Sequence, residues 1–113
     1  MNASDMAAEQ TALKLINNNI RTDGSDTKLL ARAREMESKI ISTSFKNGHF
    51  IVEVEGSNKE VYEATFFKSG KVYCTCRFCQ GLDSWDRQAV GCKHLLTGAL
   101  YMLDMFDEDE EAA

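Results

Sequence analysis

Two short motifs constrain this chain more than any other feature of its sequence: Cys74-Thr75-Cys76 and Cys92-Lys93-His94, with residues 77–91 between them. Alternate residues of a β-strand point to the same side, so a strand that ends in the first motif would bring both thiols to one point. A helix that begins with the second motif would aim a thiolate and an imidazole outward from its first turn, where unpaired amides favour the thiolate. Three sulfurs and one imidazole nitrogen suit tetrahedral Zn²⁺, and four protein ligands leave no position at which a water could be activated. The residues therefore predict one structural zinc ion held by Cys74, Cys76, Cys92 and His94.

Cys79 leaves alternatives open for this assignment, because it could replace Cys76 or His94 as a ligand or be a spare thiol beside the metal. Together with Cys76 it also forms a Cys-x-x-Cys sequence, as in redox pairs, although this one does not open a helix after a buried parallel strand. Two further interpretations are small buried apolar residues and disulfides, but Cys74 and Cys76 are too close in sequence to bridge comfortably. The arrangement in two matched pairs favours metal binding.

The length of 113 residues suffices for one domain with a small core, and in such a domain a metal clamp can decide whether the chain folds. The N-terminus lacks a basic segment followed by an apolar stretch, and Asp104 interrupts the last long apolar run. We therefore expect neither a secretory signal nor a membrane span, and a cytoplasmic, intracellular protein. In a reducing compartment, clustered cysteines are more often metal ligands or redox groups than disulfides.

The hydrophobic pattern changes from helical to strand-like and back along the chain. Apolar residues at three- and four-residue spacing predict helices over 5–20 and 27–38, the second capped by Asp26. Strand-like patterns from Ile40 onward, with Asn47-Gly48 as a hairpin turn, predict four short strands. An irregular loop over 77–91 and a final helix from Cys92 to about Phe106 follow. The expected fold class is α+β: a small antiparallel β-meander with N-terminal helices and a C-terminal helix clamped by the structural zinc site.

The charge of the chain is unevenly distributed. The formal net charge is −5, but residues 104–113 hold six acidic residues and no basic one, so residues 1–103 carry a net +1. The overall acidity therefore does not exclude nucleic acid as a partner. We expect the acidic segment to be a solvated, disordered tail, the alternative being a competitor that screens a weakly basic surface. The expected organisation is a helix and loop over 1–26, a zinc-binding domain over 27–103 and the tail over 104–113.

The two motifs resemble the SWIM-type zinc finger, whose pattern is Cys-x-Cys followed by Cys-x-His. The stretch Gly91–Leu96 looks like the family's helix start, and the helix-and-strand pattern upstream looks like the lead-in of small stand-alone members, so the resemblance covers roughly residues 30–103. Cys79, and the absence of the common proline after the second cysteine, depart from the family pattern in the loop between the two motifs. The resemblance implies a ββα-type zinc-bound core with the same four ligands. Members of the SWIM family occur in transposases, chromatin remodellers, ubiquitin-ligase-like proteins and recombination mediators. The resemblance therefore implies binding to DNA or to proteins.

Two functions of different classes remain as hypotheses. The first is DNA binding, as an accessory factor in recombination, transposition or regulation: Arg77, Arg87 and Lys93 would contact phosphates, and Phe78 and Trp85 would stack or wedge. The second is a protein-interaction adaptor with a purely structural zinc site, in which the loop with Trp85 or the first helix would dock a protein involved in DNA transactions. A purely structural interpretation of Trp85 is a loop anchor packed on the core.

Enzymatic activity is not expected from this sequence. It offers no open metal position, no nucleophile–base pair and no glycine-rich phosphate loop. Neither a small-molecule substrate nor a membrane is an expected partner.

Overall fold

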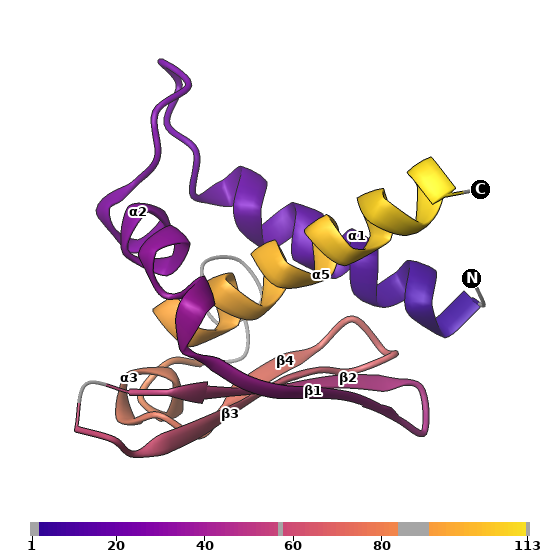
Figure 1. The fold of residues 1–113 in the computed structure, drawn as a ribbon. Coiled ribbons are helices and arrows are strands. Elements are labelled where there is room, and N and C mark those ends of the chain that lie inside the picture. The colour runs from indigo at the N-terminus through magenta and orange to yellow at the C-terminus, as the bar shows by residue number, and fades with distance from the viewer. Residues whose placement is uncertain (1–2, 57, 84–90, 113) are drawn as a thin grey trace.

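The computed structural model describes the backbone of residues 3–56, 58–83 and 91–112, and the side chains of residues 8–56, 58–83 and 91–105. Helices precede and follow an antiparallel sheet along the chain, which confirms the α+β class (Figure 1). The elements are, in order, α1 (Ala3–Asn18), α2 (Lys28–Glu35), the 3₁₀ helix η1 (Glu37–Lys39), β1 (Ile40–Lys46), β2 (His49–Glu55), β3 (Val61–Phe66), β4 (Val72–Cys74), α3 (Arg77–Gln80) and α5 (Lys93–Ala112).

The four strands pair in sequence order, β1-β2-β3-β4, which is the predicted meander. Asn47 and Gly48 connect β1 to β2 with φ of 55° and 81°, the left-handed conformations that a two-residue hairpin turn requires. The register places Phe50 opposite Phe66 and Val52 opposite Ala64. Because side chains alternate along a strand, these apolar residues share one face of the sheet.

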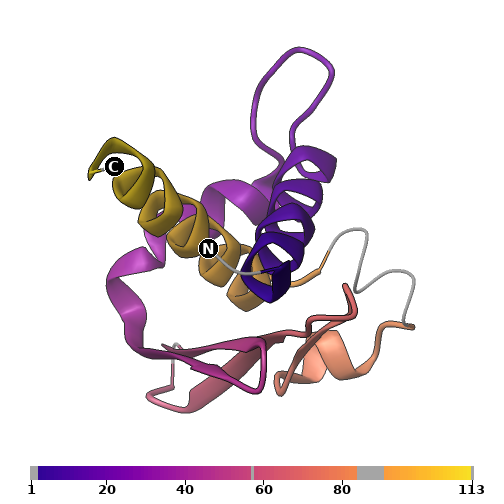
Figure 2. The ribbon, with the colours of Figure 1, turned by 90° about the vertical axis from the view of Figure 1, so that its right-hand side faces the viewer.

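The three longer helices, α1, α2 and α5, all lie over that apolar face (Figures 1 and 2). The fully buried core combines residues of the sheet, such as Phe50 and Phe66, with residues of the helices, such as Leu15, Leu30 and Leu95. Gly98 allows α5 to lie close to the strands, because a Cβ built there would be 3.0 Å from Cε2 of Phe66 and 3.2 Å from Cγ2 of Val52. The packing of α5 on the sheet brings the start of this helix to the end of β4.

The start of α2 differs from the prediction. Thr27, not Asp26, is the N-cap, and its hydroxyl accepts a hydrogen bond from the amide of Leu30 at 3.3 Å. Asp26 instead forms a salt bridge with Arg34, with 2.6 Å between Oδ2 and Nε. The prediction was wrong because Thr is also a favourable N-cap residue, and Asp26 instead pairs with Arg34, two turns further along the helix.

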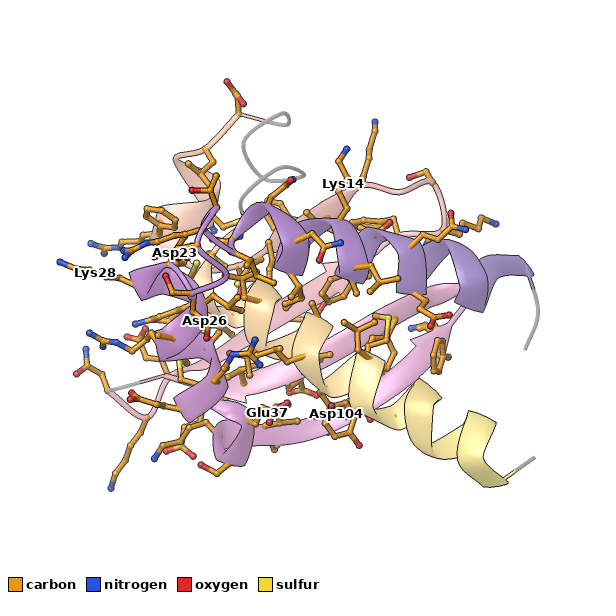
Figure 3. All side chains as sticks on the ribbon, turned by 90° about the horizontal axis from the view of Figure 1, so that it is seen from above. Lys14, Asp23, Asp26, Lys28, Glu37 and Asp104 are labelled. Atoms are coloured by element: carbon orange, nitrogen blue, oxygen red, sulfur yellow. The ribbon has the colours of Figure 1, made fainter. Side chains whose placement is uncertain are left out.

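The final helix is longer than predicted: α5 continues through Ala112, beyond the expected end near Phe106. The backbone of residues 104–112 is therefore helical where a disordered tail was expected, and its glutamates and Ala112 are good helix formers, with no glycine or proline to end the helix. Asp104 lies beside Glu37 of η1 (Figure 3), and burial together with the charge of Asp104 raises the pKa of Glu37. Among the described residues, no helix is long and apolar enough to cross a membrane.

Candidate metal centre

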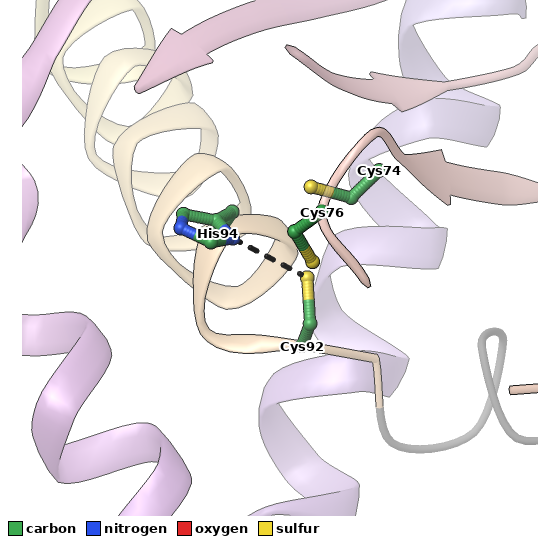
Figure 4. Close-up of side chains that lie close together, drawn as sticks. All are labelled: Cys74, Cys76, Cys92 and His94. Carbon is green, nitrogen blue, oxygen red and sulfur yellow. Dashed lines mark hydrogen bonds between the residues drawn. The ribbon is translucent and has the colours of Figure 1, made fainter. Parts of the chain in front are cut away.

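The two sequence motifs meet at one point, where the end of the sheet faces the start of α5. Cys74 is the last residue of β4 and Cys76 is the N-cap of α3, while Cys92 directly precedes α5 and His94 is its second residue. All four side chains are buried. In Figure 4 the three sulfurs and the imidazole of His94 converge, and one ligand atom from each residue lies within 4.8 Å of all the others. The structure thus brings together the four residues that the sequence predicted as ligands.

The separation of these atoms fits a tetrahedral metal site. With Zn–S distances of about 2.3 Å, the sulfurs of a tetrahedral site lie about 3.8 Å apart, so a cluster within 4.8 Å needs to contract by ~1 Å at most. Nδ1 of His94 is 3.9 Å from Sγ of Cys92, close to the spacing of two such ligands. The four residues could therefore hold one metal ion such as zinc.

The pKa values of the thiols show how strongly the cluster favours negative charge. A hydrogen bond from the Cys92 thiol lowers the pKa of Cys76 to about 4 and that of Cys74 to about 6. The pKa of Cys92 is raised, because its proton is shared with the other sulfurs. Burial alone would lower the pKa of His94, but hydrogen bonds with Cys74 and Cys76 outweigh burial and raise it. A lowered pKa favours the thiolate, which is the form of cysteine that binds a metal ion.

Cys79 lies next to the metal-ligand cluster but outside the set of four converging atoms. Its sulfur accepts a hydrogen bond from the amide of Cys74 at 3.3 Å, and its own amide donates to the sulfur of Cys76 at 3.4 Å. A hydrogen bond with Cys92 is the main cause that lowers the pKa of Cys79. These contacts make Cys79 a positioning residue for the first pair of ligands, the spare-thiol alternative of the sequence analysis.

The segment after Cys76 is more ordered at its start than predicted. The irregular loop expected over 77–91 begins with one helical turn, α3, which the side chain of Cys76 caps. Because α3 follows directly, Arg77 and Phe78 are held beside the cluster and both are exposed, Phe78 to 57%. Lys93, half-buried, is the first residue of α5. Trp85 and Arg87, the other two expected contact residues, lie outside the described residues.

A pocket of about 840 Å³ opens beside the cluster, between α2, the β2–β3 turn, α3 and the start of α5. Three of the expected contact residues, Arg77, Phe78 and Lys93, line it, as does His94. Tyr62 also lines the pocket, and its ring lies over the imidazole of His94 with 4.5 Å between centroids and 35° between planes. Tyr62 was not among the residues expected at this site, because its strand-like surroundings in the sequence give no sign that it contacts His94.

Comparison of the chain with models of protein families, with curated proteins and with solved structures found no match. The resemblance to the SWIM-type zinc finger therefore rests on the motif residues and on the geometry that brings them together.

We expect Gly56→Ala to disturb the packing of Tyr62 on His94. Gly56 is buried, and a Cβ there would overlap the Tyr62 ring, which must then move away from the imidazole. Overpacking of this kind costs about 1–3 kcal/mol in the free energy of unfolding, which urea denaturation measures. Gly81→Ala is the matched control, since a Cβ at Gly81 meets its nearest atom at an ordinary 3.5 Å. Equal unfolding midpoints for the two variants would show that the Tyr62 ring is not held in place.

Proposed function

We propose that this chain is a zinc-stabilised module of the SWIM type that binds nucleic acid, as an accessory factor in DNA transactions. The observation that carries the proposal is the position of Arg77, Phe78 and Lys93 on the wall of a pocket that three of the four metal-ligand residues also line. Cations contact phosphates and exposed aromatic rings stack on bases, so this combination is typical of nucleic-acid-binding surfaces.

The zinc ion in this proposal is structural. When bound, it would supply a crosslink between the four ligands and no reaction chemistry, because protein donors complete its tetrahedron. Cys74 and Cys76 hold the end of the sheet and the start of α3, whereas Cys92 and His94 hold the start of α5. The four ligands thereby fix the relative positions of Arg77 on α3 and Lys93 on α5. We propose no catalytic activity for the site.

A protein-interaction adaptor is the second candidate function, and one observation favours it. Strand β1 is an edge of the sheet and exposes two large apolar side chains, Ile41 at 53% and Phe45 at 45%. An exposed edge strand with apolar residues is a surface to which an extended segment of another protein can add as a further strand.

Fluorescence anisotropy with labelled oligonucleotides tests the nucleic-acid proposal. The zinc-loaded protein is titrated with single-stranded and double-stranded DNA at several salt concentrations. We expect binding that weakens as salt increases, and a slope of log affinity against log salt that falls by about 0.7–0.9 for each phosphate contact removed, as in Arg77→Gln or Lys93→Gln. Lys46→Gln is the control, because Lys46 is an exposed lysine that belongs to the β1–β2 hairpin and does not line the pocket. Absence of binding to both DNA forms at low salt would overturn the proposal and leave the adaptor as the remaining candidate.

A further inference from the structure

The pocket beside the metal centre has the size and the lining of a ligand site. Its volume of about 840 Å³ lies within the range of ~300–1,000 Å³ that is usual for small-molecule and cofactor sites. Its wall combines two aromatic rings, Tyr62 and Phe78, with the cations of Arg77 and Lys93. The amide of Asn58 and the carboxylate of Glu60 also line it. Such a wall offers aromatic surfaces for stacking, cations that can bind phosphate, and polar groups that can form hydrogen bonds with the edge of a planar ligand.

His94 supplies an independent indication that a ligand enters this pocket. Its side chain is 3% exposed, and Nε2 is buried without a hydrogen-bond partner among the described residues. Nδ1 faces the sulfur of Cys92 (Figure 4), so a metal ion held at Nδ1 leaves the proton of the neutral ring on Nε2. A buried donor without an acceptor is unfavourable, and an acceptor atom that enters the pocket would remove this defect.

Glu60 limits the kind of molecule that can supply the acceptor atom for Nε2 of His94. Its carboxylate lies in the pocket wall, where it accepts a hydrogen bond from the hydroxyl of Tyr62 at 2.7 Å. An acidic side chain of a partner protein would be repelled by this carboxylate. A nucleobase, in contrast, combines carbonyl or ring-nitrogen acceptors with, in three of the four bases, an amino group that can donate to a carboxylate. Phe78 is 57% exposed, and its ring would stack on a base. The same ring offers no comparable contact to the carboxylate of an acidic side chain.

We propose that this pocket receives one unstacked base of a single-stranded nucleic acid, an inference that rests on the proposed function and specifies its ligand. The base stacks on Phe78, one of its acceptor atoms takes the hydrogen bond from Nε2 of His94, and the flanking phosphates lie near Arg77 and Lys93. A base inside a duplex is stacked on both faces and paired at its edge, so the pocket selects single strands over duplexes.

The test compares Phe78→Ala with Phe45→Ala, an equally drastic truncation of another exposed phenylalanine, on β1 and outside the pocket. The probe is a labelled DNA strand of about 16 nucleotides, the upper end of the site size of small single-strand-binding domains. We expect the single strand to bind at least about tenfold more tightly than its duplex. We expect Phe78→Ala to weaken single-strand binding by about tenfold, which lies within the range for one stacked base, and Phe45→Ala to leave it unchanged. The zinc content of both variants verifies that the site has formed.

A second measurement follows His94 directly. In ¹⁵N NMR spectra of the zinc-loaded protein, we expect the Nε2–H proton of His94 to exchange more slowly with water and to shift downfield when the single strand binds.

Equal affinities of Phe78→Ala and Phe45→Ala for the single strand would overturn the pocket inference while DNA binding, and so the proposed function, persists. Failure of both DNA forms to bind would overturn both. A glutamate-rich peptide that displaces the strand and causes the same change at Nε2 would show that the pocket takes acidic segments of proteins.

Discussion

Cys92→Ser is expected to abolish stoichiometric zinc binding and, with it, the cooperative folding of the chain. The hydroxyl of serine stays protonated at neutral pH and is a poor zinc ligand, so the cluster loses one of its three sulfur donors. Zinc binding contributes about 10–16 kcal/mol in zinc-finger peptides, which is comparable to the whole stability of a small domain, about 5–15 kcal/mol. We therefore expect the variant to lack a cooperative thermal transition in circular dichroism and to contain less than one zinc per chain by elemental analysis.

Cys79→Ser provides the matched control, because it is the same substitution at another buried cysteine of the same cluster. It removes no atom from the converging set of four ligand atoms, and its hydroxyl can still accept the hydrogen bond from the amide of Cys74. We expect one zinc per chain and a loss of about 1–3 kcal/mol in stability from the buried hydroxyl. The assignment of the ligands fails if Cys92→Ser keeps a full complement of zinc, or if a strong chelator yields a metal-free protein that remains fully folded.

Gly98→Leu is expected to have the second largest effect, a loss of about 3 kcal/mol or more in the free energy of unfolding. Even a Cβ at this position would lie 3.0 Å from Cε2 of Phe66 and 3.2 Å from Cγ2 of Val52, and leucine places three more carbon atoms in the same interface. Interiors are close-packed, so α5 must move away from the sheet. Because Cys92 and His94 lie at the start of α5, we also expect weaker zinc binding, measured by competition with a chromophoric chelator.

Gly98→Ala is the control for this variant. Its single methyl group requires shifts of only a few tenths of an ångström, and alanine is favoured over glycine inside a helix by about 1 kcal/mol. The two contributions oppose each other, so we expect a stability close to that of the unsubstituted protein. If Gly98→Leu unfolds at the same urea concentration as Gly98→Ala, the close packing of α5 on β2 and β3 is not the contact that positions the metal centre.

Local signals in the sequence predicted the features that depend on neighbouring residues. Asn47-Gly48 indicated a hairpin because few other residue pairs adopt two successive left-handed conformations. The spacing of Cys74 and Cys76 indicated a shared ligand site because alternate positions near the end of a strand point to one side. The structure has the hairpin at the predicted turn and brings the two cysteines to one site, but β4 ends at Cys74, and Cys76 lies beyond the predicted strand as the N-cap of α3.

Features that depend on competition or on distant contacts were not predictable in this way. Asp26 and Thr27 are both capable caps, and in the structure Thr27 caps the helix while Asp26 pairs with Arg34. The α3 turn depends on the side chain of Cys76 as its N-cap, a role that the sequence pattern did not indicate. The contact of Tyr62 with His94 joins two positions that no local pattern connects.

The position of α5 in the chain has a consequence for how the protein is made. This helix contacts α1, α2 and the sheet, yet it is synthesised after every other described element. The hairpin of β1 and β2 can form early from local contacts, whereas α1 and α2 lack their common packing partner until α5 is available. The second pair of ligands arrives with the same helix, so core closure and metal uptake should occur as one late, cooperative event, with the apolar faces of the nascent chain unprotected until then.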